Sequence, residues 1–320
     1  MSSDRPSFPK VIEFQTLSKC NGYCTTCPYR NLAKNQVSRR MTDEMIEKII
    51  SECDEHKGEI ERIIPYMNNE PSLDVRFIEV LRRIKKENHF IELSTNFSGI
   101  TEDIMGVIIK EELIDDLRIS FFGGNEKYYS ELMPGLRFET NLKMIHKFID
   151  MNQRAGLPVK YQIIAILCPW IHMEDNLGLL HNIFPDSQIH VFGFLDRAGN
   201  VAEHKNEVLY NKDDTSVLCG CGLNRPFERI CILADGNAVL CSQDWGEEAI
   251  VGNVTEDGIG KVWNGKRFEW FRKAIKGEIR AENELICHRC KLAELVSDGF
   301  AYPNFAGDEY ISQDGIKKVT

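Results

Sequence analysis

The chain has 320 residues, of which 28% are charged and 42% are hydrophobic, with a formal net charge of −10 at pH 7. This composition is typical of a globular protein with one large and one small domain. The acidic balance argues against a nucleic-acid partner, because no basic stripe is available to neutralise phosphates. The N-terminus has no apolar signal segment and no apolar run approaches the length of a membrane span. We therefore expect a cytoplasmic protein without a membrane partner.

Residues 11–195 alternate between short apolar runs, which are typical of buried strands, and amphipathic stretches, which are typical of helices. The predicted strands are Val11–Leu17, Ile60–Met67, Phe90–Thr95, Asp116–Phe122, Val159–Leu167 and Gln188–Leu195. The predicted helices are about Asp43–Cys53, Val75–Glu87, Glu102–Glu111, Glu139–Met151 and Met173–Ile183. Thr42 and Thr101 precede acidic residues at two of these helix starts, where a capping hydroxyl and the macrodipole favour a helix.

This series of strands and helices predicts an α/β fold with parallel strands joined by right-handed crossovers. The periodicity alone fits a partial barrel and a doubly wound open sheet equally well. In a barrel, functional residues lie at the C-terminal ends of the strands. The segments that follow the predicted strands are therefore the first place to look for a site.

Three cysteines follow the first predicted strand at the spacing C-x3-C-x2-C, namely Cys20, Cys24 and Cys27. Cysteine thiolates are the usual ligands of four-iron clusters, and three of them leave one iron open, as a catalytic site requires. The same three residues are compatible with half of a zinc site. The chain has 11 cysteines, and in a cytosolic protein this number favours metal ligation over disulfides.

The cysteine motif resembles the signature of radical S-adenosylmethionine (radical SAM) enzymes. The resemblance implies a partial (β/α)6 TIM-like barrel, and a [4Fe–4S] cluster held by Cys20, Cys24 and Cys27 whose open iron binds SAM. It also implies reductive cleavage of SAM to a 5′-deoxyadenosyl radical, in which the cofactor supplies the difficult chemistry. The family usually has a large apolar residue before the third cysteine, where this chain has Thr26. Stacking on the adenine must therefore come from another residue, with Tyr29 as a candidate.

The loops after three predicted strands resemble the SAM-contacting positions of the family. The string N-N-E-P at residues 68–71 resembles its G-G-E-P motif, although it also fits a plain strand–helix turn. The resemblance implies contacts to SAM from Asn69, Glu70, Asn96 and Ser120, the last as a ribose contact. Arg197, after the sixth strand, is a candidate to bind an anionic group of SAM or of the substrate.

A second group of cysteines lies in the C-terminal third of the chain. Its members are Cys219, Cys221, Cys231, Cys241, Cys287 and Cys290. Residues 231–241 predict a hairpin with its turn at D-G-N, as such pairs prefer, followed by helical stretches at Ile259–Trp263 and Phe268–Ile275. A four-cysteine zinc ribbon also fits this spacing.

The order of cysteine, hairpin, cysteine and C-x2-C resembles the twitch domain, a short form of the SPASM domain of radical SAM enzymes. The resemblance implies a second, closed [4Fe–4S] cluster held by Cys221, Cys241, Cys287 and Cys290. Cys219 competes with Cys221 as the first ligand, and Cys231 is expected to be a small buried hydrophobic residue. The expected organisation is a barrel over residues 1–205, an α+β twitch domain over 206–296 and a tail over 297–320.

The resemblance implies an enzyme that abstracts a hydrogen atom from a small polar substrate, such as a sugar or aminocyclitol, and oxidises it. The cysteine layout is similar to that of the 2-deoxy-scyllo-inosamine dehydrogenases of this family. The first strand is expected to begin at residue 11, which leaves no room for a leader-binding domain and favours a small substrate over a peptide. A flavodoxin or ferredoxin is the expected reductant.

Two alternatives stay open. In the first, the enzyme is an epimerase or modifies peptides, and a cysteine returns a hydrogen atom to the substrate. Cys168, at the end of the fifth predicted strand, is then the candidate donor, although a buried structural role also fits this residue. In the second alternative, which belongs to another class, the chain is a zinc-binding interaction protein.

Overall fold

Six parallel strands in the first 193 residues form the partial barrel that the family resemblance implies. They are β1 (Val11–Phe14), β2 (Arg62–Ile64), β3 (Glu92–Thr95), β4 (Asp116–Ser120), β5 (Lys160–Leu167) and β6 (Ile189–Gly193). β1 pairs with β2, and β3 to β6 pair in chain order. A parallel bridge between Ile63 and Ile91 joins the two groups. The computed structural model describes residues 5–32, 37–184, 189–201, 217–281, 285–297, 300–303, 309–312 and 315–318.

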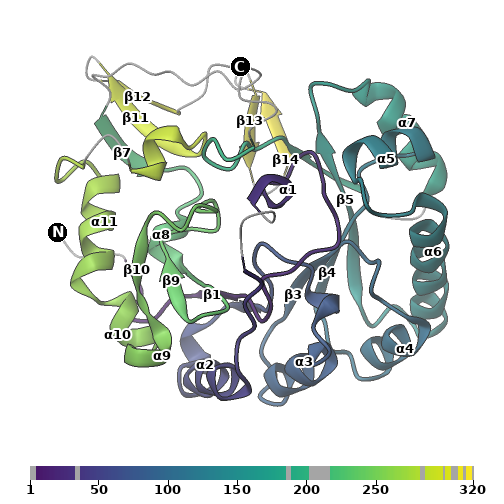
Figure 1. Cartoon of the computed structure of the whole chain (residues 1–320), viewed down its shortest axis with the longest axis horizontal. Coiled ribbons are helices and arrows are strands. Elements are labelled where there is room, and N and C mark those ends of the chain that lie inside the picture. Colours follow the sequence, from purple (N-terminus) through teal and green to yellow (C-terminus); the bar gives the residue numbers. More distant parts are fainter. Residues whose placement is uncertain are drawn as a thin grey trace.

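Helices cover the outer face of these strands, as Figure 1 shows. They are α2 (Asp43–Glu55), α3 (Phe77–Lys85), α4 (Glu102–Lys110), α6 (Phe138–Arg154) and α7 (Met173–Ile183), with α1 (Tyr29–Leu32) and α5 (Glu126–Leu132) in loops where no helix was predicted. The two predicted caps are confirmed, because Thr42 Oγ1 accepts from Met45 N–H at 3.2 Å and Thr101 Oγ1 from Ile104 N–H at 3.3 Å. Apolar positions at helical spacing, such as Ile46, Ile49 and Cys53 of α2, face the core.

The C-terminal part of the chain continues the barrel sheet. β8 (Arg229–Ile232) pairs in parallel with β1, and β9 (Asn237–Val239) and β10 (Ile250–Asn253) follow as antiparallel neighbours. The strand order is therefore β10-β9-β8-β1-β2. Gly236 in the hairpin turn has φ +83, a conformation that favours glycine. The small domain expected from the sequence thus shares a sheet with the barrel.

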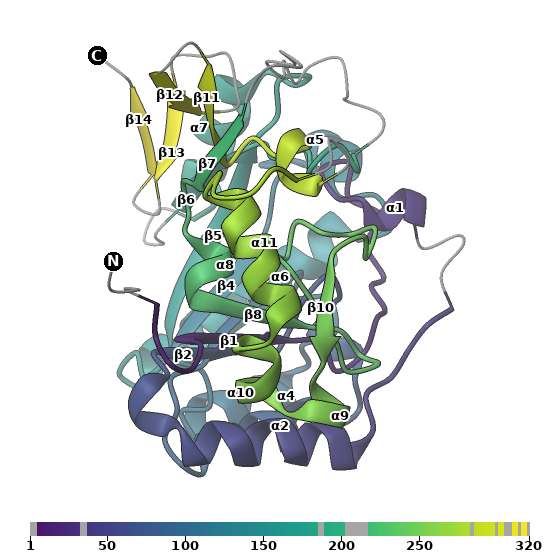
Figure 2. The ribbon, with the colours of Figure 1, turned by 90° about the vertical axis from the view of Figure 1, so that its left-hand side faces the viewer.

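Two short helices of the C-terminal part, α9 (Val254–Asp257) and α10 (Ile259–Trp263), lie beside the barrel helix α2 (Figure 2). The next helix, α11 (Lys266–Ile275), packs instead against β7 (Val217–Cys221) and β10. Glu52 of α2 accepts hydrogen bonds from the backbone N–H groups of Ile259 at 2.7 Å and Gly260 at 2.8 Å, and thereby satisfies the start of α10. One hydrophobic core runs from the barrel helices through to Trp263 and Phe268.

A second small sheet and a hairpin complete the described chain. β7 (Val217–Cys221) pairs with β11 (Ala293–Ser297), which pairs with β12 (Phe300–Pro303). β13 (Glu309–Ser312) and β14 (Gly315–Lys318) form a hairpin, and β14 lies against β6. The predicted domain boundary at residues 205–206 lies outside the described residues. Within the part of the chain that is described, no helix is long and apolar enough to cross a bilayer.

Candidate active site

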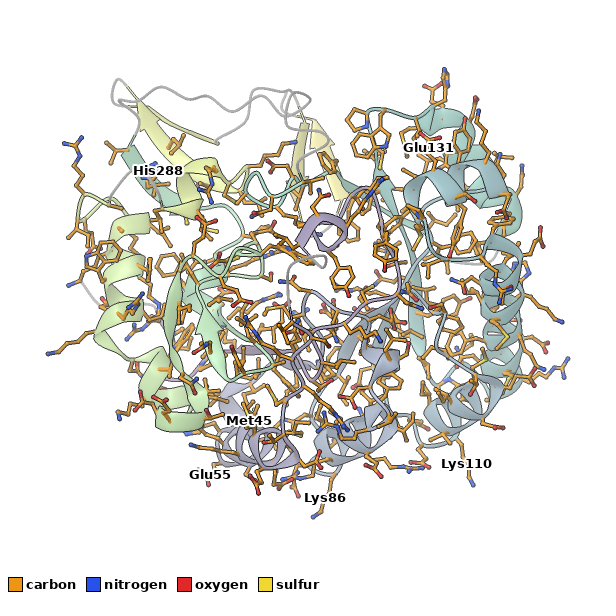
Figure 3. All side chains as sticks on the ribbon, viewed as in Figure 1. Met45, Glu55, Lys86, Lys110, Glu131 and His288 are labelled. Atoms are coloured by element: carbon orange, nitrogen blue, oxygen red, sulfur yellow. The ribbon has the colours of Figure 1, made fainter. Side chains whose placement is uncertain are left out.

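A cavity of about 350 Å³ lies where the barrel strands end and the C-terminal part begins. Figure 3 shows the side chains of the molecule and labels His288, which lies in the C-x2-C segment of the C-terminal part. The structure brings seven predicted site residues to its wall: Cys20, Cys24, Cys27, Asn69, Glu70, Asn96 and Ser120. Thr26, Tyr29 and Arg197 line it as well. Loops that are distant in the sequence therefore meet at one cavity, as the parallel strand order requires.

The loop that carries the first three cysteines is fixed to the loop after α5. Tyr23 N–H donates to Pro134 O at 2.8 Å and Thr25 N–H to Leu132 O at 3.0 Å. Burial, followed by the nearby charges of Glu70 and Cys27, raises the pKa of Cys20 to about 12. Burial and the two neighbouring thiols raise the pKa of Cys24 well above its usual range. Binding of a metal cluster to these cysteines must therefore release their protons.

Glu70 joins the loops on either side of it. Its carboxylate is buried and accepts from Ser72 Oγ at 2.6 Å, Thr95 Oγ1 at 2.6 Å and Asn96 N–H at 2.7 Å. Its own N–H donates to Lys19 O in the cysteine loop at 2.9 Å. Burial raises the pKa of Glu70, whereas these hydrogen bonds act to lower it. Through its side chain and its backbone N–H, Glu70 therefore holds the cysteine loop and the loops after β2 and β3 together.

Two asparagines provide polar groups next to the cysteines. Asn96 Nδ2 donates to Asn21 Oδ1 at 2.9 Å and lies 3.9 Å from Cys20 Sγ. Asn69 Oδ1 accepts from Met67 N–H at 2.9 Å, but its buried Nδ2 has no hydrogen-bond partner among the described residues. An orphaned buried donor in a cavity wall fits a site that holds a polar ligand.

The second cysteine group is also assembled by the fold. Burial, followed by the thiols of Cys290, Cys221 and Cys241, raises the pKa of Cys287. The pKa of Cys290 is raised to about 12 by burial and by Cys241, with a smaller contribution from Cys221. These four are the cysteines that the sequence assigns to the second cluster.

The remaining cysteines have other neighbours, although Cys231 is also close enough to Cys241 for that thiol to act on its pKa. Burial, followed by the charge of Glu294, raises the pKa of Cys219. Cys231 is 1% exposed in a small apolar cluster, and its Sγ lies 3.5 Å from Glu13 Oε2. Cys168 is 0% exposed in the main core and does not line the cavity. The structure therefore does not bring the candidate hydrogen donor to the site.

A network of charged side chains on the inner face of the strands was missed by the sequence reasoning. Arg229 Nη1 on β8 contacts Glu13 Oε2 on β1 at 2.8 Å. Arg62 Nη1 and Arg118 Nη1 each lie 2.8 Å from an oxygen of Glu92. The available signal was a charged residue within a short, otherwise buried strand, as in V-I-E-F and R-I-C-I. Such residues face the interior of a barrel at alternate positions.

The cysteine thiols fit the two iron–sulfur clusters that the family resemblance implies. Three thiols at one cavity supply three ligands and leave space beside them, and four thiols form the second group. Among the described residues, no three His, Cys, Asp or Glu side chains are arranged as ligands of one metal ion. A four-iron cluster is larger than a single ion, and its thiolate ligands are accordingly further apart.

Comparisons with known proteins agree with this geometry. Residues 15–167 match the family model of the radical SAM superfamily, and residues 219–291 match that of SPASM, an iron-sulfur cluster-binding domain. Over 98 residues the chain is 26% identical to the S-adenosyl-L-methionine-dependent 2-deoxy-scyllo-inosamine dehydrogenase of Niallia circulans. That match spans 30% of this chain and 38% of the curated relative.

Solved structures share the fold at low sequence identity. BtrN in complex with AdoMet and 2-DOIA has a TM-score of 0.55 at 15% identity, over 84% of this chain and 88% of that chain. Streptococcus suis SuiB bound to the precursor peptide SuiA has a TM-score of 0.62 at 16% identity, over 91% and 71%. For anSMEcpe with bound AdoMet the TM-score is 0.59 at 13% identity, over 88% and 90%.

The two family matches occur in the same order as the two cysteine groups. A radical SAM domain uses SAM and an iron–sulfur cluster, and a SPASM domain adds an auxiliary cluster. The chain belongs to the radical SAM superfamily and carries a C-terminal SPASM domain.

Proposed function

We propose that this radical SAM enzyme oxidises a small polar substrate in the cavity that Cys20, Cys24 and Cys27 line. Cys20, Cys24 and Cys27 would hold the cluster that binds SAM, and Cys221, Cys241, Cys287 and Cys290 the auxiliary cluster. When bound, the first cluster would supply the electron for reductive cleavage of SAM, the chemistry that removes a hydrogen atom from the substrate. The observation that carries the proposal is the cavity itself, which is lined by the first three cysteines and by the buried carboxylates of Glu13, Glu70 and Glu92.

The chain's own residues have separable tasks in this reaction. Asn69, Asn96 and Ser120 would bind SAM, with Tyr29 beside its adenine, while Glu70 positions Asn96. After the hydrogen atom is taken, oxidation of an alcohol or amine requires the loss of one proton and one electron. The auxiliary cluster would accept the electron, and a side chain must accept the proton. Both oxygens of Glu92 are paired with arginines, whereas Arg229 and Cys231 approach Glu13 at the same oxygen, Oε2. We assign proton acceptance to Glu13.

A second candidate function, epimerisation or peptide modification with a thiol donor, differs from oxidation in what happens to the substrate radical. The fold likeness to SuiB is as close as that to BtrN, so a peptide substrate stays an alternative. The burial of Cys168 in the core supports oxidation, because a hydrogen donor must reach the substrate. An external reductant such as flavodoxin or ferredoxin, and a cytoplasmic location, are part of the proposal.

The mass of the product formed in heavy water tests the choice. Oxidation gives a product two mass units lighter than the substrate, and the Cys168→Ala variant gives the same product. A thiol donor exchanges its hydrogen with solvent, so epimerisation places one deuterium on the product. Deuterium in the product, with inversion lost in Cys168→Ala, would contradict the proposal.

A further inference from the structure

Two arginines in the cavity wall share one neutral acceptor. Arg197 follows β6, and Arg225 begins the short helix α8 (Arg225–Glu228) of the SPASM domain. With the Gln243 amide in the orientation that satisfies its neighbours, Oε1 accepts from Arg225 Nη1 at 2.8 Å and from Arg197 Nη1 at 2.9 Å. Gln243 is 2% exposed. A buried amide therefore holds two guanidinium groups side by side.

Within the described part of the chain, these arginines differ from the others at the cavity in forming no ion pair with a carboxylate. Arg118 pairs with Glu92 and Arg229 with Glu13. Among the described residues, neither Arg197 nor Arg225 forms an ion pair, and Arg225 donates only to Ser242 Oγ, at 3.1 Å, besides Gln243. A guanidinium has five N–H donors. Most of the N–H donors of Arg197 and Arg225 are therefore left for a ligand.

The loop that carries Arg197 is held in place from both sides. Arg197 and Ala198 have φ values of +55 and +53, in the left-handed region that residues other than glycine rarely adopt. Asp196 accepts from Gly199 N–H at 2.9 Å, and Arg289 of the C-x2-C segment donates to Ala198 O at 3.3 Å. Strained residues that the surrounding structure fixes in this way are frequent at ligand sites.

The positive charges of Arg197 and Arg225 repel each other, and no ion pair among the described residues offsets this repulsion. Burial, and after it the charge of Arg225, lowers the pKa of Arg197. Two adjacent cations of restricted solvent access are stabilised by an anion that accepts from both. Arg197 follows β6 and Arg225 lies in the SPASM domain, whereas the residues assigned to SAM follow β2, β3 and β4. The two arginines therefore come from other elements than those SAM positions, and, against the effect of burial, the charge of Arg197 acts to lower the pKa of Cys27.

We propose that Arg197 and Arg225, aligned by Gln243, form a subsite for an anionic group of the substrate, either a carboxylate or a phosphate. The inference rests on the proposed function and specifies its substrate class. Planar guanidinium groups suit both anions through paired hydrogen bonds. A neutral sugar or an aminocyclitol without an anionic group would leave both guanidinium groups without an ion-pair partner among the described residues.

Calorimetric titration of the reconstituted, SAM-loaded protein under anaerobic conditions tests the subsite. The probes are acetate, inorganic phosphate and acetamide, the neutral counterpart of acetate, at constant ionic strength. We expect saturable binding of at least one anion and none of acetamide, and the preferred anion identifies the group. In the double variant Arg197→Gln, Arg225→Gln the anion should bind at least about tenfold more weakly, the loss of one strong charged contact. Arg267→Gln, an exposed position on α11, should bind it as the wild type does.

The double lysine variant, Arg197→Lys with Arg225→Lys, keeps both charges if the glutamine variant loses its clusters. It should retain anion binding at reduced affinity. Absence of anion binding in the wild type, or equal binding in wild type and double glutamine variant, would overturn the subsite. Loss of SAM binding together with anion binding would assign the arginines to SAM and overturn it too. Wild-type protein that cleaves SAM but binds neither anion refutes this inference alone, whereas failure to cleave SAM refutes the proposed function.

Discussion

The Glu70 carboxylate accepts a hydrogen bond from the Asn96 backbone N–H at 2.7 Å, and this contact joins the loops that follow β2 and β3. The Asn96 side chain in turn donates to Asn21 Oδ1 at 2.9 Å, within the cysteine loop. One buried carboxylate thus fixes three loops that the chain brings together from distant positions. Glu70 is therefore a positioning residue for the SAM site that we propose.

Replacing Glu70 with alanine should weaken SAM binding. The change leaves the buried donors of Thr95 and Asn96 unpaired, at a cost of about 1–3 kcal/mol each. If about 1.4 kcal/mol of this free-energy cost is borne only by the SAM-bound state, the affinity for SAM drops about tenfold. Anaerobic equilibrium binding of SAM measures it. Ser72→Ala removes a 2.6 Å hydrogen bond to the same carboxylate but leaves Asn96 in place, so its effect should stay below about threefold. Equal losses in the two variants would contradict the positioning role.

Replacing Cys287 with alanine should remove the auxiliary cluster and leave the first one. We expect about half of the bound iron to be lost, because each four-iron cluster needs its own thiolate set. Cys219→Ala is the matched control and should keep all of its iron, since Glu294 and not another thiol is the charged neighbour that raises its pKa. Iron analysis after anaerobic reconstitution decides. Full iron in Cys287→Ala, or loss in Cys219→Ala, would show that the ligand set is wrong.

Asp196 gives the stability of the protein a defined pH dependence. Burial raises its pKa from 3.8 to about 6, against the opposing hydrogen bond from Gly199 and the charge of Lys291. The folded protein holds this proton more tightly than the unfolded chain, so its stabilising contribution is lost as the pH rises from about 4 to about 6. Asp196→Asn should therefore raise the free energy of unfolding by up to about 3 kcal/mol at pH 7.5 and by about half of that at pH 5.

Anaerobic urea unfolding of both proteins at the two pH values measures this difference. The control is Asp150→Asn, which removes an exposed carboxylate that contacts Arg154 at 3.0 Å and should change stability little at either pH. A stability gain for Asp196→Asn that is the same at both pH values would contradict the pKa of this group.

The strands, helices and cysteine groups of this fold could be predicted because their signals are local. The short helix α5 was missed, although Asn125 caps it by accepting from Tyr128 N–H at 2.9 Å, because its seven residues are too few to show a helical period. Glu13 and Cys231 stand side by side on paired strands but 218 positions apart. No local sequence pattern indicates that strands so far apart in the chain pair with each other. The shared sheet and the charged network in the cavity therefore could not be predicted.

Formation of 5′-deoxyadenosine by the reduced protein tests the central claim most directly. Reconstituted wild type, Cys24→Ala and Cys53→Ala are incubated anaerobically with SAM and dithionite, and the nucleoside is quantified. Cys53 is a buried core thiol on α2 outside both cysteine groups, so its variant controls for the loss of a cysteine as such. We predict that wild type and Cys53→Ala form 5′-deoxyadenosine and that Cys24→Ala forms none. Equal formation by Cys24→Ala and wild type would contradict the assignment of this loop as the site of SAM cleavage.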